Sequence, residues 1–499
     1  MMLSGKSFIA GIWQGDATNG VFNAFSPSQN CALETPFFNA TELMVADAIN
    51  QAQRAFIEYR QTTREQKSAF LNCIADEIEK LGDKLLETTH QETNLPMMRL
   101  QGERGRTVNQ LRFFASELGK ENNVLYRLRE FDQAEPDRAP LPKPQLELDY
   151  LPVGVVAVFG ASNFPYAFST AGGDTASALA AGCPVVMKSH TAHPGTSELI
   201  TRAIEAAIKK CNMPKGVFSM IQAKHYEISH QLVAHPFVKA VGFTGSLNVA
   251  KKLIETINQR TEAIPFYGEL GSVNPQFVLS ASIDDAQIGL GHALVQSMLM
   301  GNGQFCTSPG VWLVHNREAR LIDEIKESIE ASKSDTLLTP AIVSSYKSAI
   351  EARLKLNNVS LLAKGLEVES FHATPHVFKT DLETYLETKA LHEEVFGPQA
   401  VIVTYQDEAE LFQFVSQLEG QLTASVHGNE LAISRNQALI EWLQYAVGRL
   451  IFNQMPTGVE VCCSMNHGGP FPSSSDVRST SVGSGALLRF VRPICYQGR

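Results

Sequence analysis

From Val153 onward, short apolar runs alternate with segments of helical apolar spacing, and no other feature restricts the possible folds as strongly. Apolar runs of this length are typical of strands buried on both faces of a sheet. Their alternation with helices predicts a parallel, doubly wound sheet, which binds ligands beyond the carboxyl ends of its strands. Strands are expected at 154–159, 185–188, 217–221 and 238–243, and helices at 165–181, 195–211, 226–234 and 246–258.

A second alternating region begins near Asn274 and predicts a second α/β domain, with the junction near Glu269. Strands are expected at 276–279 and 311–314, and a helix at 284–300 with Asp284 near its N-cap. A length of 499 residues agrees with at least two domains, because single hydrophobic cores stop growing well below that size.

The flanking segments have different patterns. Apolar spacing is largely helical from Thr41 to Leu128, and the Pro-rich stretch 135–144 then predicts an extended connection. The stretch 146–151 alternates apolar and polar residues as a half-exposed strand does. The tail, 487–495, also has a strand pattern, and we expect it to pair with 146–151 within or between subunits.

The composition is that of a globular, acidic chain, with 44% hydrophobic residues and a formal net charge of −10. This charge gives no reason to expect a nucleic-acid partner. The N-terminal apolar stretch 8–13 is too short for a signal peptide, and the run around 153–159 is too broken to span a membrane. Eight scattered cysteines without a C-x-x-C pair argue against a metal site and favour a reducing cytoplasm.

Cys306 is the first candidate for chemistry, in the segment Gly301-Asn-Gly-Gln-Phe-Cys-Thr-Ser-Pro309. A thiol attacks carbonyl groups well only as a thiolate, so a nucleophilic cysteine needs an activating environment. A glycine-containing turn after a long helix can place the sulfur at a cleft. A buried free cysteine is an equally good interpretation of this segment alone.

Three further segments follow expected strands, and each has an ordinary alternative. Glu269 lies between glycines and can activate water if burial moves its pKa toward neutrality, although a solvated loop carboxylate is the commoner case. Asn163 can donate to an oxyanion or simply cap a turn. Gly245 and Ser246 open a helix whose N–H groups can bind a pyrophosphate, or form an ordinary β–α turn. The chain contains no G-x-G-x-x-G fingerprint.

Taken together and in this order, the segments resemble the aldehyde dehydrogenase superfamily over nearly the whole chain. The most similar branch contains α-ketoglutarate semialdehyde (2,5-dioxovalerate) dehydrogenases and NADP-dependent fatty aldehyde dehydrogenases. One departure is Ser272, where the family commonly has a second glycine after Gly271. The matching segments are Asn163-Phe-Pro165, Lys188, Phe243-Thr-Gly-Ser246, Glu269-Leu-Gly271, Gly303-Gln-Phe-Cys306 and Glu393-Glu-Val-Phe-Gly-Pro398.

The resemblance implies a fold of two doubly wound Rossmann-like domains with a β-strand oligomerisation arm. It implies that Cys306 attacks the aldehyde to form a thiohemiacetal, that Asn163 stabilises the oxyanion, and that Glu269 activates the water that hydrolyses the thioester. The implied cofactor-binding domain is 1–129 with 151–268, the arm is 130–150 with 480–499, and the catalytic domain is 269–479. A homodimer or homotetramer is expected, because free strands would leave exposed edges.

The resemblance also implies a nicotinamide cofactor. NAD-preferring members carry a Glu three residues after the lysine, whereas Thr191 occupies that position here. A Glu repels a 2′-phosphate and a Thr can donate to it, and Lys224 or His225 can add positive charge. We therefore expect NADP, with NAD possible. Cofactor contacts are implied for Lys188, Thr191, Gly245, Ser246, Glu394 and Phe396.

The aldehyde is less well defined by the sequence. A semialdehyde with a distal carboxylate needs a cation, and Arg104, Arg106 and Arg112 are candidates, although solvated helix arginines are commoner. A fatty aldehyde needs an apolar tunnel instead, for which Phe164, Phe168 and Phe471 are candidates. CoA acylation and a non-catalytic role are further alternatives, and the intact Glu269 and Cys306 argue against them. His467 is expected to be a loop histidine bonded to backbone rather than a proton-transfer group.

Overall fold

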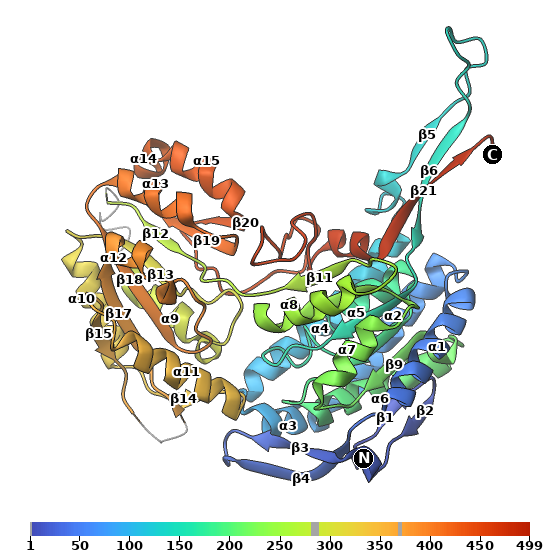
Figure 1. The fold of residues 1–499 in the computed structure, drawn as a ribbon, viewed down its shortest axis with the longest axis horizontal. Coiled ribbons are helices and arrows are strands. Elements are labelled where there is room, and N and C mark those ends of the chain that lie inside the picture. The colour runs from blue at the N-terminus through green and yellow to red at the C-terminus, as the bar shows by residue number, and fades with distance from the viewer. Residues whose placement is uncertain (1, 281–288, 368–371) are drawn as a thin grey trace.

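The computed structural model describes residues 2–280, 289–367 and 372–499 (Figure 1). Two helix-covered sheets lie side by side, and a strand arm projects from the body. This arrangement confirms the predicted fold of two doubly wound units with an arm. The N-cap predicted at Asp284 lies outside the described residues, and the helix that follows is α9 (Leu290–Leu299).

The first sheet has five parallel strands, four of them at the four predicted places, and two short antiparallel strands at one edge, in the order β11-β10-β7-β8-β9-β1-β2. The chain winds from β7 to β9 and then crosses back to β10, which pairs with β7. The carboxyl ends of β7 and β10 therefore flank the crevice where such sheets bind ligands. The strands are β7 (Val155–Phe159), β8 (Val185–Lys188), β9 (Phe218–Ile221), β10 (Val238–Thr244), β11 (Phe266–Glu269), β1 (Ser7–Ile9) and β2 (Ile12–Gln14).

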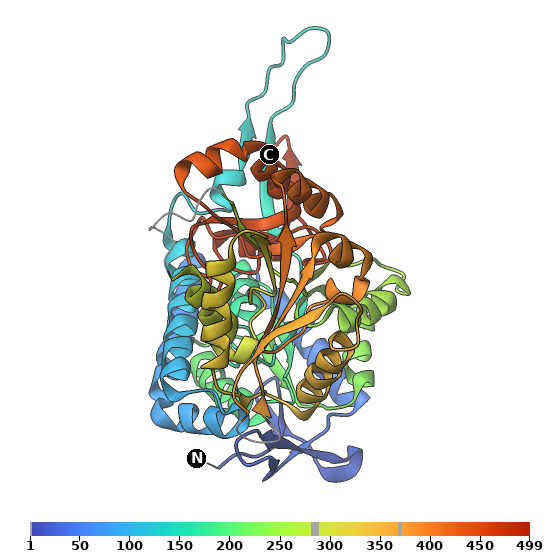
Figure 2. The ribbon, with the colours of Figure 1, turned by 90° about the vertical axis from the view of Figure 1, so that its left-hand side faces the viewer.

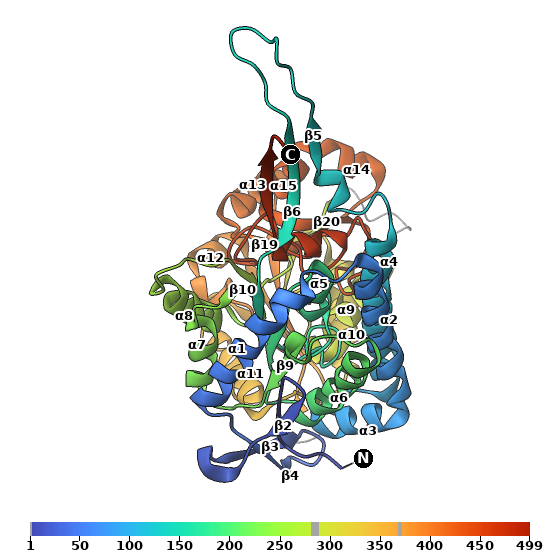
Figure 3. The ribbon, with the colours of Figure 1, turned by 90° about the vertical axis from the view of Figure 1, so that its right-hand side faces the viewer.

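Helices cover both faces of this sheet, and the N-terminal region is helical as expected (Figures 1 and 3). The helix predicted at 165–181 is shorter, because α5 begins only at Gly173. The N–H groups of Tyr166 and Ala167 donate to the Glu103 carboxylate instead of opening a helix. The helices are α1 (Glu42–Tyr59), α2 (Arg64–Lys80), α3 (Gly82–Thr93), α4 (Met97–Gly119), α5 (Gly173–Ala181), α6 (Pro194–Lys210), α7 (Tyr226–Ala234) and α8 (Leu247–Asn258).

The second sheet has the order β15-β17-β18-β13-β12-β19-β20, and only β15 runs antiparallel to its neighbour. Its central strands are buried on both faces, as their apolar sequences require (Figure 2). The helices of this half are α9, α10 (Ala319–Glu330), α11 (Pro340–Arg353), α12 (Leu382–Glu387), α13 (Glu408–Gln417), α14 (Glu430–Arg435) and α15 (Gln437–Ala446) (Figure 1). The strands are β12 (Gln276–Val278), β13 (Val311–His315), β15 (Ser360–Lys364), β17 (His376–Asp381), β18 (Gln399–Tyr405), β19 (Gln421–His427) and β20 (Val447–Phe452).

The arm is a small sheet in the order β21-β6-β5, built from β5 (Glu130–Asp132), β6 (Leu146–Pro152) and β21 (Val491–Gln497) (Figure 3). The predicted pairing of the tail with 146–151 is confirmed within the chain, since β21 pairs antiparallel with β6. The tail prediction began too early, because residues Ser484–Phe490 form a 3-10 helix, η7. Nowhere in the described ranges is a helix both long and apolar enough to cross a membrane.

Candidate active site

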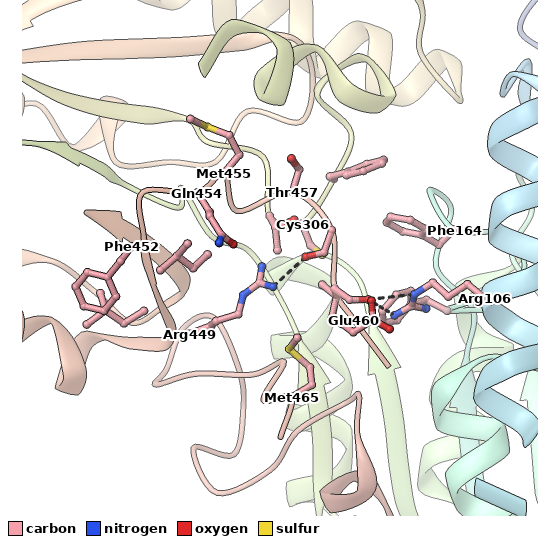
Figure 4. Close-up of a pocket in the computed structure, with 17 residues that line it drawn as sticks. Arg106, Phe164, Cys306, Arg449, Phe452, Gln454, Met455, Thr457, Glu460 and Met465 are labelled. Carbon is pink, nitrogen blue, oxygen red and sulfur yellow. Dashed lines mark hydrogen bonds between the residues drawn. The ribbon is translucent and has the colours of Figure 1, made fainter. Parts of the chain in front are cut away.

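Cys306 follows α9 and the short 3-10 helix η5 (Met300–Gly303), on a loop whose shape depends on glycine. Gly303 has a φ of +70°, and a Cβ there would lie 2.1 Å from the Gly397 carbonyl oxygen. The Asn274 side chain fastens the loop by donating to the carbonyl oxygens of Cys306 and Ser308, each at 2.9 Å. The thiol is half-buried and faces a cavity (Figure 4).

Glu269 ends β11, and His467 lies on the connection between β20 and η7 that passes between the two sheets (Figure 1). His467 Nε2 lies 3.5 Å from Cys306 Sγ and 2.8 Å from Glu269 Oε1. The Ser481 hydroxyl donates to the other oxygen of Glu269 at 2.7 Å. Both Glu269 and His467 are buried. The prediction that His467 is a loop histidine bonded to backbone is therefore wrong.

The charges of this cluster favour a carboxylate and a neutral thiol. Burial disfavours the charged form of Glu269, but the nearby His467 imidazole and the hydrogen bond from Ser481 outweigh it and lower its pKa. The shift of this pKa is downward and not toward neutrality, the condition considered for Glu269 above, so the carboxylate stays ionised. Burial and the Glu269 carboxylate raise the pKa of the Cys306 thiol well above its usual value. The thiol proton must consequently pass to a neighbouring base before Cys306 can attack.

Asn163 lies in the turns between β7 and α5, next to the cysteine loop. Its side-chain N–H donates to the Gln304 carbonyl oxygen at 2.8 Å, two residues before Cys306. Arg99 fixes the Asn163 backbone by donating to its carbonyl oxygen at 2.7 Å. A primary amide has a second N–H, so one donor of Asn163 remains for an oxyanion beside Cys306.

The crevice at the carboxyl ends of β8 and β10 has the features that a dinucleotide requires. Lys188 ends β8, is half-buried, and has no carboxylate partner among the described residues. Gly245 and Ser246 are exposed at the N-terminus of α8, whose first backbone N–H groups have no partner within the helix and can bind a pyrophosphate, although the Gly245 N–H itself donates to the Glu269 carbonyl oxygen at 3.1 Å. The residues present therefore fit a dinucleotide with its ribose near Lys188 and its phosphates near α8.

Glu394 and Phe396 lie on the segment that leads into β18 of the second sheet, and Glu394 approaches Gly271 just beyond β11. A Cβ on Gly271 would come within 2.9 Å of the Glu394 carboxylate, so the glycine makes room for it. Ser272, where the family commonly has glycine, leaves the turn intact. Its hydroxyl accepts from Leu422 N–H at 3.0 Å and lies 2.9 Å from the Gln421 side-chain oxygen.

Thr191 and Lys224 stand at the same edge of the first sheet. Lys188 pairs with Ile221 across β8 and β9, and Thr191 and Lys224 each follow three residues later. Thr191 is half-buried, whereas Lys224 and His225 are exposed. The neutral Thr191 and the exposed Lys224 and His225 therefore follow the ends of the two paired strands.

A cavity of about 800 Å³ opens in front of Cys306. Arg106 and Arg449 enter it from opposite sides (Figure 4). Arg106 Nε and Nη2 each donate to the Val459 carbonyl oxygen at 3.3 Å, and its Nη1 is buried with no partner in the described chain. Arg449 donates to the carbonyl oxygens of Gly458 and Pro456 at 2.9 and 2.6 Å.

Of the three predicted cations, only Arg106 reaches the cavity. Arg104 donates to the Gly82 carbonyl oxygen, and Arg112 pairs with surface carboxylates on α2. Of the three predicted aromatic residues, Phe164 and Phe168 line the cavity, whereas Phe471 is outside its lining and 60% exposed. Sequence reasoning missed Arg449, Asn274 and Ser481, because no motif connects them to the cysteine segment.

Comparison with known proteins agrees with this geometry. Residues 13–485 match the aldehyde dehydrogenase family. The chain is 41% identical over 500 residues to α-ketoglutaric semialdehyde dehydrogenase 2 of Azospirillum brasilense, covering 99% of this chain and 94% of the relative. It is 42% identical over 465 residues to α-ketoglutaric semialdehyde dehydrogenase of Acinetobacter baylyi, covering 92% and 88%.

Solved structures share the fold at low identity. A variant of betaine aldehyde dehydrogenase from Staphylococcus aureus has a TM-score of 0.85 and 20% identity, covering 100% of this chain and 96% of that one. NADP-dependent glyceraldehyde-3-phosphate dehydrogenase from Bacillus halodurans, complexed with NADP, has a TM-score of 0.85 and 21% identity, covering 99% of each chain. Fold and sequence together define an oxidoreductase. The chain belongs to the aldehyde dehydrogenase family, whose members oxidise aldehydes with NAD(P).

Proposed function

We propose that the protein oxidises α-ketoglutarate semialdehyde to the dicarboxylic acid, with Cys306 as the nucleophile. The observation that carries the proposal is the cavity in front of Cys306, which holds the two guanidinium groups of Arg106 and Arg449. The substrate has an aldehyde at one end and an α-keto carboxylate at the other. Guanidinium groups bind carboxylates in a directional, charge-assisted way. The two relatives at 41% and 42% identity carry this substrate in their names.

In the proposed reaction, Cys306 gives its proton to the adjacent His467–Glu269 pair and attacks the aldehyde carbon. The free N–H of Asn163 stabilises the oxyanion of the thiohemiacetal. The dinucleotide, when bound, supplies the hydride acceptor. Once the pair has released the thiol proton to solvent through the cavity, Glu269 takes a proton from the water that hydrolyses the thioester on Cys306. His467 and Ser481 hold Glu269 in place for this second role.

A substrate panel tests the proposal. We expect a higher kcat/KM for α-ketoglutarate semialdehyde than for medium-chain alkyl aldehydes of similar length. Equal or better turnover of the alkyl aldehydes would favour the fatty aldehyde alternative, because Phe164 and Phe168 also line the cavity. Release of an acyl-CoA instead of a free acid would favour the CoA-acylating alternative.

NADP is the proposed hydride acceptor, with Lys188, Gly245, Ser246, Glu394 and Phe396 as the other contacts. The support is the neutral Thr191 together with the exposed Lys224 and His225, since Thr191 brings no negative charge that would repel a 2′-phosphate. A Thr191→Glu variant is expected to lose kcat/KM with NADP and keep it with NAD. A wild type that prefers NAD in steady-state kinetics would refute this assignment.

We also propose that 1–129 with 151–268 form the cofactor-binding domain, 269–479 the catalytic domain, and 130–150 with 480–499 the arm. Subunits are proposed to assemble through this arm as a homodimer or homotetramer. Support comes from β5 and β6, whose residues remain half-buried or exposed in the isolated chain. Their edge is available for pairing with another subunit. All eight cysteines are free, which suits the proposed reducing cytoplasm. Sedimentation of wild type and of a chain lacking 133–144 tests the role of the arm.

A further inference from the structure

Three donor atoms of the kinds that bind zinc converge behind Cys306, which lines the cavity. Cys306 Sγ, His467 Nε2 and a carboxylate oxygen of Glu269 all lie within 4.8 Å of one another. Zinc–ligand bonds of about 2.0–2.3 Å in a tetrahedron place neighbouring donors roughly 3.4–3.6 Å apart. The sulfur–nitrogen distance of 3.5 Å already fits this geometry. The nitrogen–oxygen distance of 2.8 Å must open by only about 0.6 Å to match it.

The hydrogen bonding of the cluster is incomplete without a cation. Within the part of the chain that the structure describes, Glu269 Oε1 is buried and has no aligned hydrogen bond, although His467 Nε2 lies 2.8 Å away. The same Nε2 is also the contact of Cys306 Sγ, and an imidazole nitrogen carries at most one hydrogen. A cation between the three groups would satisfy all of them. The thiolate and the carboxylate together supply the two negative charges that a divalent ion requires.

The residues around the three donor atoms suit a metal ion that binds reversibly. Cys306 lines the cavity, so an ion can enter from that side and keep a water in its fourth position. The Ser481 hydroxyl holds Glu269 Oε2 at 2.7 Å, and Thr480 Oγ1 accepts from the His467 backbone N–H at 2.8 Å. Such outer contacts keep ligand side chains oriented toward a metal.

We propose that Cys306, His467 and Glu269 form a reversible inhibitory zinc site. The Zn–S bond forms as the S–H bond breaks, the proton goes to solvent, and no electrons are transferred. Because the ion displaces a proton, its affinity rises with pH. Zinc at this position occupies the lone pair with which Cys306 would attack an aldehyde. Inhibition rests on the proposed role of Cys306, whereas binding does not.

Cobalt is the probe for this site, because Co²⁺ replaces Zn²⁺ in tetrahedral thiolate sites and gives a near-ultraviolet sulfur-to-cobalt absorption band. Full-length enzyme is freed of metal with EDTA, desalted, and titrated with CoCl₂ in a buffer that does not bind metals. We expect the band to saturate at one Co²⁺ per chain and to disappear when ZnCl₂ is added. Activity is expected to fall with occupancy and to return with EDTA.

Three variants locate the metal. Cys306→Ser should abolish the band, and His467→Gln should weaken cobalt binding at least about tenfold. Cys463→Ser is the matched control, because Cys463 is an exposed thiol whose sulfur lies 3.6 Å from a Glu117 carboxylate oxygen. It should keep both the band and the activity.

Several outcomes would overturn the inference. A band that survives in both Cys306→Ser and His467→Gln, or that is lost in Cys463→Ser, places the metal elsewhere. If the enzyme is active but shows no cobalt absorption band on titration, the zinc site is refuted and the proposed function still stands. If the band saturates while activity stays the same, both the inhibition by metal and the nucleophilic role proposed for Cys306 are refuted.

Discussion

Arg106→Met is the sharpest test of how the substrate is held. The substitution keeps an unbranched side chain that fills the cavity wall but removes the guanidinium. The buried Nη1 of Arg106 has no partner in the described chain, so it is the N–H available to a substrate carboxylate. Its other two donors reach a single carbonyl oxygen, that of Val459, at 3.3 Å each, which are long bonds. Their loss should therefore disturb the loop only slightly.

The expected fall in kcat/KM follows from the kind of contact that Arg106→Met removes. A hydrogen bond to a charged group contributes about 1.5–3 kcal/mol, and about 1.4 kcal/mol is tenfold in kcat/KM. We expect kcat/KM for α-ketoglutarate semialdehyde to fall roughly 10- to 150-fold. For pentanal, which has no carboxylate, it should change by less than about threefold, because the loop is only slightly disturbed.

NADPH formation with each aldehyde measures this ratio, and Arg104→Met is the matched control. Arg104 lies two residues away on the same helix and donates to the Gly82 carbonyl oxygen instead of lining the cavity. The control should leave both substrates unchanged. If Arg106→Met lowered kcat/KM equally for both aldehydes, Arg106 would be a support of the loop and the carboxylate reasoning would be refuted.

Three further predictions concern the thiol, the oxyanion and the fold. Because burial raises the pKa of Cys306, kcat/KM should keep rising with pH beyond the ordinary thiol pKa of about 8.5, and a pH profile that levels off below that value would contradict this. Asn163→Ala should lower kcat by about 10²–10³-fold with unchanged circular dichroism, whereas an effect on KM alone would exclude an oxyanion donor. Arg489→Met removes the partner that lies 2.7 Å from the Asp174 carboxylate, which is only 11% exposed. The free energy of unfolding, measured in urea, should fall by about 3–5 kcal/mol. A fall below about 1 kcal/mol would show that the pair is not needed.

The strands of the first sheet could be predicted from the sequence because each is marked by a short apolar run of neighbouring residues. Strands β8 and β10 are apolar runs between helices, and each was placed within a residue of its observed bounds. The start of α5 was placed too early, because the competing acceptor is the Glu103 carboxylate on α4. No periodicity within 165–181 reveals an acceptor from another helix.

The site depends on contacts between distant segments, which explains the remaining errors. Cys306 and His467 are 161 residues apart and share no motif, so the spacing of candidate ligands predicted no metal cluster. For the arginines, by contrast, a usable signal existed. Successive residues of a helix turn by about 100°, so Arg104 and Arg106 point to opposite sides of α4 and cannot serve one ligand. Nothing in the sequence marked Arg449, which follows an ordinary apolar helix and begins to line the cavity only through tertiary packing.

The connection between β20 and η7 carries His467 and Ser481, and its late place in the chain decides when the site is completed during synthesis. During synthesis, Cys306 leaves the ribosome long before these two residues do. A growing chain therefore holds its thiol without the imidazole and hydroxyl that position Glu269. A thiol in such a chain can add to an aldehyde only reversibly, because the proposed oxidation needs the assembled site, so catalysis begins only after this connection has folded between the two sheets.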